Sequence, residues 1–163
     1  MSDPGWVLHD GDFKLIEAEL TKLADLANAK LTFLVDKDGH LIASAGDSRS
    51  IDTTSLASLT AGNIAASGGI AKLLGEKEFT FLFHEGERDH IHLSTIAQRV
   101  ILVVIFDQRS SLGLVRLRVR KSGEALTKIF SAILSNSEKD RQEQETRSPF
   151  AAITEADIDR LFG

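Results

Sequence analysis

The chain has 163 residues, 42% of them hydrophobic, a formal net charge of −5 and no cysteine. Disulfides and thiolate metal sites are therefore excluded, and the composition fits a reducing cytoplasm. The negative charge argues against nonspecific binding to nucleic acid, whose phosphates require a basic surface. The longest apolar run, residues 100–106, is too short to span a membrane, and the N-terminus lacks the features of a secretory signal. Length and composition predict one domain with helices and strands, followed by a tail.

The first predicted helix covers residues 13–29, where apolar side chains recur at spacings of three and four. Asp12 is suited to capping the start of this helix, because its carboxylate can accept hydrogen bonds from free backbone N–H groups. Asn28 is suited to ending it.

A β-hairpin is predicted next, with strands at residues 31–35 and 41–45. Between them lies Asp36-Lys-Asp-Gly39, and Asp-Gly tolerates the positive φ that tight turns require. Three further strands are predicted at residues 79–84, 91–97 and 100–106. Their links are short, and parallel crossovers need a dozen or more residues, so these strands must be antiparallel.

The second predicted helix covers residues 53–74, and its start is marked by the capping types of residues 52–55. The residues expected to anchor it by burial are Leu56, Leu59, Ile70, Leu73 and Leu74. Its middle reads Ala61-Gly-Asn-Ile-Ala-Ala-Ser-Gly-Gly69. Glycine inside a helix costs about 1 kcal/mol relative to alanine, so three glycines here need a reason.

The last part of the domain, residues 112–134, has two interpretations. Residues 114–120 alternate like a strand, but the helical period continues to the end of the segment. One long helix is preferred, and a strand followed by a helix is the alternative. Residues 136–148 are polar without apolar anchors and are predicted to be a flexible linker.

A short amphipathic helix is predicted within residues 149–163. Its start combines a capping box with a hydrophobic staple, and acidic residues crowd its first turn. So short a helix is marginal alone in water, and it is expected to order by docking on another surface, as a helix in a groove. A disordered end is the alternative. The residues expected to dock are Phe150, Ile153, Ile158, Leu161 and Phe162.

The predicted element order is α-β-β-α-β-β-β-α plus the tail, an α+β fold with a five-stranded antiparallel sheet in residues 1–135. That order resembles the Roadblock/LC7 domain family, and particularly its bacterial MglB branch. The segments that carry the resemblance are Phe33-Leu-Val-Asp-Lys-Asp-Gly-His-Leu-Ile42, Ser55-Leu-Ala-Ser-Leu-Thr-Ala-Gly-Asn-Ile-Ala-Ala66, Leu73-Leu-Gly-Glu76, and Val103-Val-Ile-Phe-Asp107 followed by Ser111-Leu-Gly-Leu-Val115. The resemblance covers residues 13–134, and the end of the tail, Asp157-Ile-Asp-Arg-Leu-Phe162, is similar to that of myxobacterial members.

The resemblance implies a homodimer that regulates a Ras-like small GTPase of the MglA type in its GTP-bound form. In the family, the sheet extends across the dimer and the second helices lie side by side, forming the surface that holds one GTPase. Family members supply no arginine finger and hold the GTPase so that its own catalytic groups act. The implied setting is cell polarity and gliding motility, in the cytoplasm and at a cell pole.

A stripe of small residues on the second helix is the most informative feature of the sequence. Residues 57, 61, 65 and 69 are four apart and share one face, which lets another backbone approach closely. The stripe either packs on the protein's own sheet or contacts the partner helix or GTPase, and the second interpretation is preferred. The predicted partner-binding set is Ala57, Ala61, Gly62, Ala65, Gly68, Gly69 and Lys72.

A cluster of arginines follows the last strand, with Arg116 and Arg120 on one helical face and Arg118 elsewhere. An arginine finger can accelerate GTP hydrolysis, but it normally sits on a loop, and these residues lie in a regular element. A solvated or ion-paired face is the preferred interpretation, and electrostatic steering of the GTPase is a further one.

No catalytic, cofactor or metal site is predicted. His90 and His92 would share a strand face, as a metal pair does, but no third ligand has a telling spacing, so a structural role is preferred for them and for His84. Residues 62–69 superficially resemble a phosphate loop but lack its Gly-Lys-Ser/Thr and a preceding strand. Asp36 and Asp38 fit the hairpin turn better than a calcium loop.

Three functions are therefore considered. The first is a GTPase-activating protein, with assistance to nucleotide exchange as an added role, that is not itself an enzyme. The second is a Roadblock scaffold that binds a GTPase or motor complex without altering hydrolysis. The third is a small-molecule sensor, which requires a polar-lined pocket under the sheet, and the sequence gives no sign of one.

Overall fold

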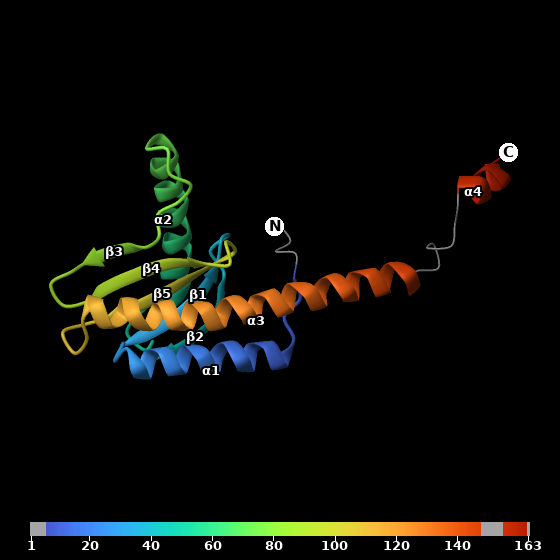
Figure 1. Cartoon of the computed structure of the whole chain (residues 1–163). Coiled ribbons are helices and arrows are strands. Elements are labelled where there is room, and N and C mark those ends of the chain that lie inside the picture. The colour runs from blue at the N-terminus through green and yellow to red at the C-terminus, as the bar shows by residue number, and fades with distance from the viewer. Residues whose placement is uncertain (1–5, 148–154, 163) are drawn as a thin grey trace.

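The computed structural model describes residues 6–147 and 155–162 and contains a five-stranded antiparallel sheet. Its strands are β1 (Leu31–Asp36), β2 (Leu41–Gly46), β3 (Leu82–Glu85), β4 (His90–Ile96) and β5 (Val100–Phe106). The order across the sheet is β2-β1-β5-β4-β3, so β2 and β3 form its two edges. Figure 1 shows this arrangement, which confirms the predicted α+β class.

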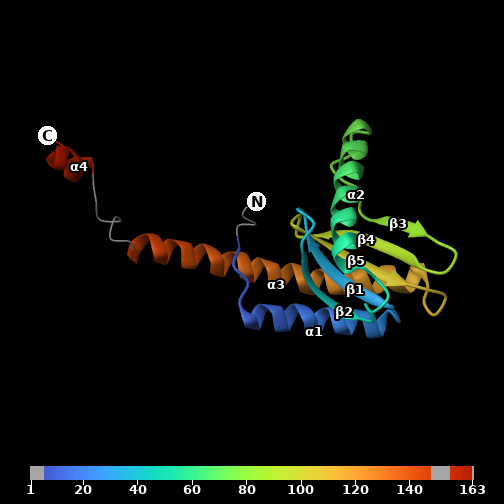
Figure 2. The same ribbon diagram turned by 180° about the vertical axis from the view of Figure 1, so that it is seen from behind.

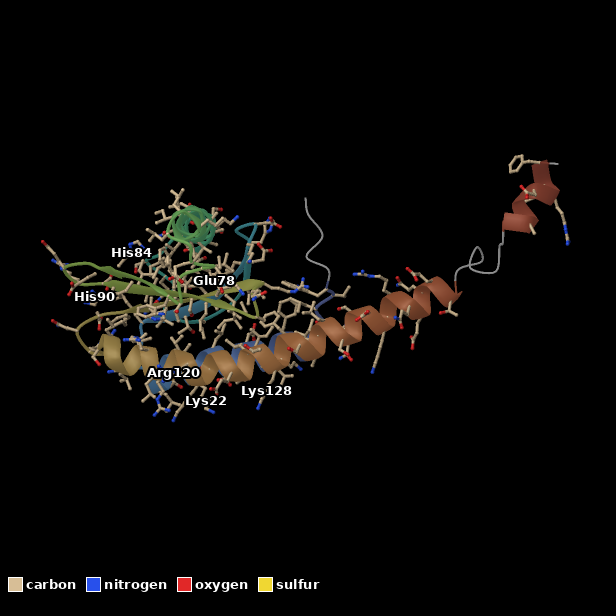
Figure 3. The ribbon with its side chains drawn as sticks, turned by 45° about the horizontal axis from the view of Figure 1, so that its top comes forward. Lys22, Glu78, His84, His90, Arg120 and Lys128 are labelled. Carbon is tan, nitrogen blue, oxygen red and sulfur yellow. The ribbon has the colours of Figure 1, made fainter. Side chains whose placement is uncertain are left out.

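The helices are α1 (Asp10–Leu26), α2 (Thr53–Leu73), α3 (Leu112–Arg147) and α4 (Glu155–Phe162). The first three of them cover the two faces of the sheet. The views in Figures 1 and 2 show α1 and α3 side by side on one face, whereas α2 covers the other and projects beyond the sheet. The view along α2 in Figure 3 shows the same three layers.

The central strand β5 explains the position of these layers. Every residue from Val100 to Phe106 is buried. Because successive strand residues point to opposite faces, even-numbered residues pack with α1 and α3, and odd-numbered residues pack under α2. A strand buried on both faces is a continuous apolar run, which is how this segment reads in the sequence.

The ends of α1 differ slightly from the prediction. The helix begins earlier than predicted, so Asp12 lies inside its first turn and not before it. There its Oδ2 accepts a hydrogen bond from the backbone N–H of His9 at 2.9 Å. Asn28 follows the helix with φ 52°, as expected for a residue that ends it, and its Nδ2 donates to the carbonyl of Arg109 at 2.6 Å.

The start of α2 confirms the predicted cap. The Asp52 carboxylate accepts hydrogen bonds from the backbone N–H of Ser55 at 3.1 Å and from its hydroxyl at 2.7 Å. These bonds hold the pKa of Asp52 below its usual value. The cap therefore fixes the point at which the chain leaves the β2 edge and begins to cross the sheet.

Strand β3 is shorter than the predicted strand at residues 79–84. Pairing with β4 begins only at Leu82, which lies opposite Leu93. The preceding residue, Phe81, stacks its ring on His92 with the centroids 4.9 Å apart, and the guanidinium of Arg116 lies 4.6 Å from the ring centroid. Phe81 is therefore engaged across the sheet face before the ladder begins.

Helix α3 is one continuous element of 36 residues. The helical interpretation of residues 114–120 is confirmed, whereas the linker predicted at residues 136–148 is wrong through Arg147. Residues 136–147 are rich in good helix formers, and extending an existing helix requires no new nucleus. The buried hydroxyl of Ser137 also accepts a hydrogen bond from the backbone N–H of Val7 at 2.9 Å, which attaches this part of α3 to the segment that precedes α1.

None of the helices in residues 6–147 and 155–162 combines the length and apolar character that crossing a bilayer demands.

Gly46 provides a test of this architecture. Its φ is +107°, and a Cβ there would lie 2.5 Å from the carbonyl oxygen of Lys30. We expect Gly46→Ala to lower the free energy of unfolding by about 1–3 kcal/mol, because the alanine is strained and clashes with backbone. The measurement is urea denaturation. The matched control is Gly11→Ala, whose Cβ meets nothing within 4 Å in α1 and which should be neutral or slightly stabilising.

Candidate functional site

The far side of α2 presents apolar side chains to solvent. Leu59, Ile70 and Leu73 are 71%, 53% and 88% exposed. Together with the exposed Gly62 and Ala66 they recur at spacings of three and four, so they lie along one side of the helix. We call this strip, made of these five residues, the outer α2 face. A helix that is apolar on its solvent side as well as its core side is typical of an interaction surface.

The exposure of these residues corrects the sequence analysis. Leu59, Ile70, Leu73 and Leu74 were expected to anchor α2 by burial, and all four are exposed. The sheet has room for only one side of the helix, and that side carries Ala57, Thr60, Ala61 and Ala71. The sequence signal that could have revealed the outer α2 face is the excess of large apolar residues over what one helix side can bury.

The small-residue stripe is divided between two environments. Ala57 and Ala61 are buried in the cluster that includes Phe33 of β1. Here the interpretation as packing on the protein's own sheet holds: Ala57 is fully buried, and Ala61 is 8% exposed. Ala65 and Gly69 lie further along α2, and both are exposed.

A groove of about 360 Å³ lies between the far half of α2 and the chain that leads into β3. We call it the α2 groove. Five of the seven residues predicted to bind a partner line it, namely Ala61, Ala65, Gly68, Gly69 and Lys72. Of the other two, Ala57 lies in the core and Gly62 on the outer α2 face.

Charge in the α2 groove is predominantly positive. Its lining includes the ammonium groups of Lys37, Lys72 and Lys77 and the carboxylate of Glu78. Figure 3 labels Glu78 close to the end of α2. A groove with small residues on one wall and lysines around it suits a partner that brings a closely approaching backbone and acidic side chains.

The glycines of α2 have no role within the described fold. A Cβ added to Gly62, Gly68 or Gly69 would meet nothing within 4 Å, and none of the three has a positive φ. Each glycine therefore lowers the stability of the helix by about 1 kcal/mol relative to alanine, and no contact within the described fold requires it.

The arginines considered as fingers lie on the opposite side of the molecule. Arg116 and Arg120 belong to α3, on the sheet face away from α2, and they line a separate cavity there. Arg116 is stacked on the ring of Phe81. These two side chains are therefore not available to a partner that binds the α2 groove.

The histidines of β4 share one face, as predicted. His92 is buried, and burial together with the charge of Arg116 lowers its pKa to about 4, so the imidazole is neutral at physiological pH. Among the described residues, the grouping suited to a metal is Asp36, Asp38 and His40. Asp36 already uses both carboxylate oxygens in its turn: Oδ1 accepts from the N–H groups of Asp38 and His40 at 2.9 Å, and Oδ2 lies 3.2 Å from His40 Nδ1.

The docking residues predicted in the tail are only partly described. Phe150 and Ile153 lie outside the described residues, as does the side chain of Ile158. Leu161 and Phe162 belong to α4 and are exposed. The predicted helix is present, and its docking role remains a prediction.

The glycine argument can be tested by stability. We expect Gly62→Ala to raise the free energy of unfolding by about 0.5–1 kcal/mol, because alanine favours the helix and the described fold leaves the position open. The measurement is urea denaturation at matched protein concentration, with Gly46→Ala as the control that destabilises. A fall in stability for Gly62→Ala would contradict the inference that the fold itself does not need this glycine.

Comparison with known proteins identifies residues 15–106 as a Roadblock/LC7 domain. MglB of Myxococcus xanthus is 59% identical to this chain with a TM-score of 0.72, over 74% of this chain and 98% of that one. The gliding protein MglB of Thermus thermophilus is 30% identical with a TM-score of 0.73, over 78% and 97% of the two chains. No curated protein matches the sequence.

A further solved structure, described as MglB with a tetrameric arrangement, is 30% identical with a TM-score of 0.76, over 82% of this chain and 100% of that one. The family domain spans more than half of the sequence, and it contains the sheet and α2. The identities to the MglB structures extend over most of the chain. The chain therefore belongs to the Roadblock/LC7 domain family, as a member of the MglB type.

Proposed function

We propose that this protein is a homodimeric regulator that activates GTP hydrolysis by an MglA-type Ras-like GTPase, in the setting of cell polarity and gliding motility. The observation that carries the proposal is the outer α2 face with its adjoining groove: apolar, glycine-rich and uncovered. A surface of this kind is costly in water and in helix stability, and burial by a partner offsets both costs. The protein needs no substrate chemistry of its own for this role.

The dimer is proposed to form through β3 and α2. As an edge strand, β3 has one row of backbone N–H and C=O groups without a strand partner. The Nδ2 of Asn63 lies 2.9 Å from Nε2 of His84, which links α2 to this edge. Antiparallel pairing of β3 with the same strand of a second copy would extend the sheet and bring the two α2 helices together by two-fold symmetry. An MglB relative in a tetrameric arrangement supports self-association.

The GTPase is proposed to bind across the paired α2 helices. Small residues at Ala65, Gly68 and Gly69 let a partner backbone approach closely, and the lysines of the α2 groove attract acidic side chains. The sequence of α2 contains no arginine. Activation is therefore proposed to come from positioning: the bound GTPase is held in the conformation in which its own catalytic groups face the γ-phosphate.

A pair of alanine-to-arginine variants tests this surface. We expect Ala65→Arg to abolish binding of the GTP-bound GTPase and to reduce stimulated GTP turnover to the unstimulated rate, because a long cation blocks close approach. The matched control is Ala132→Arg, an exposed alanine in α3, which should bind and stimulate like the unchanged chain. Binding is measured by titration and turnover by phosphate release, after circular dichroism shows that both variants are folded.

Three outcomes decide between the functions. Acceleration of about tenfold or more, equivalent to about 1.4 kcal/mol of barrier, establishes an activating protein. Binding without acceleration makes the chain a scaffold. Normal binding and stimulation by a folded Ala65→Arg variant would show that the α2 groove is not the GTPase site.

The tail is proposed to contact the GTPase away from the α2 surface and to assist nucleotide exchange. The exposed apolar side chains of Leu161 and Phe162 on a short helix are suited to docking in a groove of the partner. We expect a chain ending at Arg147, and the full chain with Leu161→Ala and Phe162→Ala, to keep its own oligomeric state but to slow exchange on the GTPase by about tenfold. Release of a fluorescent nucleotide measures the rate. An unchanged exchange rate and affinity would remove the tail from the mechanism.

A further inference from the structure

A second cavity, of about 510 Å³, lies on the sheet face opposite α2, between β4 and the first half of α3. We call it the β4–α3 cavity. Small-molecule sites commonly have volumes of about 300–1,000 Å³. A small-molecule sensor requires such a pocket under the sheet. The walls of this cavity come from segments far apart in the chain, so the sequence alone does not reveal it.

Two buried polar side chains on the β4 side of this cavity lack hydrogen-bond partners. His92 is 2% and Ser94 8% exposed, and both line the cavity. Neither His92 Nδ1 nor Ser94 Oγ has a partner in the structure. His90 Nδ1 and Arg118 Nε, which belong to residues outside the cavity lining, are likewise buried without a partner, and all four atoms are inaccessible to solvent. His92 and Ser94 therefore contribute to the β4 wall without exposing these atoms to the cavity.

Cationic side chains line the α3 wall. Arg116, Arg120 and Lys128 project from successive turns of the helix, with the carboxylate of Glu124 between them. Figure 3 labels Arg120 and Lys128 on this helix. The chain as a whole carries a net charge of −5, so this concentration of positive charge is local. It favours an anionic group over a neutral or cationic one.

The rest of the lining is apolar and partly aromatic. Phe81 lies between the imidazole of His92 and the guanidinium of Arg116. Ile96 and Val119 extend the apolar surface across the cavity. Gly123 keeps α3 close to the sheet, since a Cβ there would lie 3.3 Å from Ile96 Cδ1. The cavity thus combines an apolar floor with hydroxyl, imidazole and guanidinium groups.

We propose that the β4–α3 cavity binds a small soluble organic anion, with its carboxylate or phosphate paired with Arg116 and Arg120 and its apolar body against Phe81. The acidic tail of another copy is a poorer fit, because a helix of eight residues is about 12 Å long and at least 10 Å wide. This site is separate from the proposed GTPase surface and does not depend on it.

The test is a titration of the isotopically labelled full-length protein with 1-naphthyl phosphate, followed by nuclear magnetic resonance. We expect saturable shifts of the backbone amides of Ser94, Thr95 and Gly123. The probe 1-naphthol lacks the phosphate, and inorganic phosphate lacks the apolar ring. Each should therefore bind at least about tenfold more weakly than 1-naphthyl phosphate. Shifts confined to α2, or no saturable shifts, would overturn the proposal.

Variants test the role of the cavity residues. The double variant Arg116→Gln, Arg120→Gln should weaken 1-naphthyl phosphate binding by about tenfold or more, whereas Lys121→Gln, on the same helix outside the cavity, should not. Undiminished binding by the folded double variant, or displacement of the probe by a peptide of residues 149–163, would overturn the assignment.

Discussion

The seven residues of β5 are buried on both faces of the sheet, and the remaining architecture depends on that double burial. Full burial of one large aliphatic side chain stabilises the folded state by about 1.5–3 kcal/mol. The side chains of β5 point to both faces of the sheet, so helices must cover both faces for all of them to be buried. One face requires α1 and α3, and the other requires α2. The two faces are thereby assigned to different helices, and the α2 groove and the β4–α3 cavity lie on opposite sides of the same strands.

Helix α2 combines an anchored half with a projecting half. Ala57 and Ala61 fit closely against the sheet, while Ala65 and Gly69 repeat the same spacing where the helix lines the open α2 groove. The same residue pattern therefore serves helix–sheet packing near the cap at Asp52 and an open surface further on. Large apolar residues on the outer side, of which Leu73 is the most exposed, give that surface an apolar character that the fold alone does not need.

Much of this organisation could be predicted from the sequence where the signal is local. The run at residues 100–106, the Asp-Gly turn and the cap at Asp52 each specify their own element, and the order of elements indicated the family. Features that depend on contacts between distant segments could not be read in this way. The delayed start of β3 depends on Phe81 meeting His92 and Arg116, and the exposure of Leu59 depends on which side of α2 the sheet covers.

The candidate site, too, could be predicted from the sequence only where the signal is local. Helical spacing placed Ala65 and Gly69 on one side of α2, and the structure brings them into a groove with Lys72. Spacing alone could not separate them from Ala57 and Ala61, because that distinction is made by the sheet edge. The linker prediction at residues 136–148 is wrong through Arg147 for another reason. A polar composition is typical of a flexible segment, but the same residue types also extend a helix that is already formed.

The unbroken length of α3 has a consequence for the tail. A helix of 36 residues is about 54 Å long, and its last 19 residues, after Lys128, account for about 28 Å of that rod. The eight Cα–Cα steps from Arg147 to Glu155 span at most about 29 Å when fully extended, and α4 adds about 12 Å. While α3 remains intact, the tail therefore reaches back about 41 Å at most and cannot contact the first two turns of its own helix. The length of α3 therefore limits how far the tail extends from the domain and which neighbouring molecules it can contact.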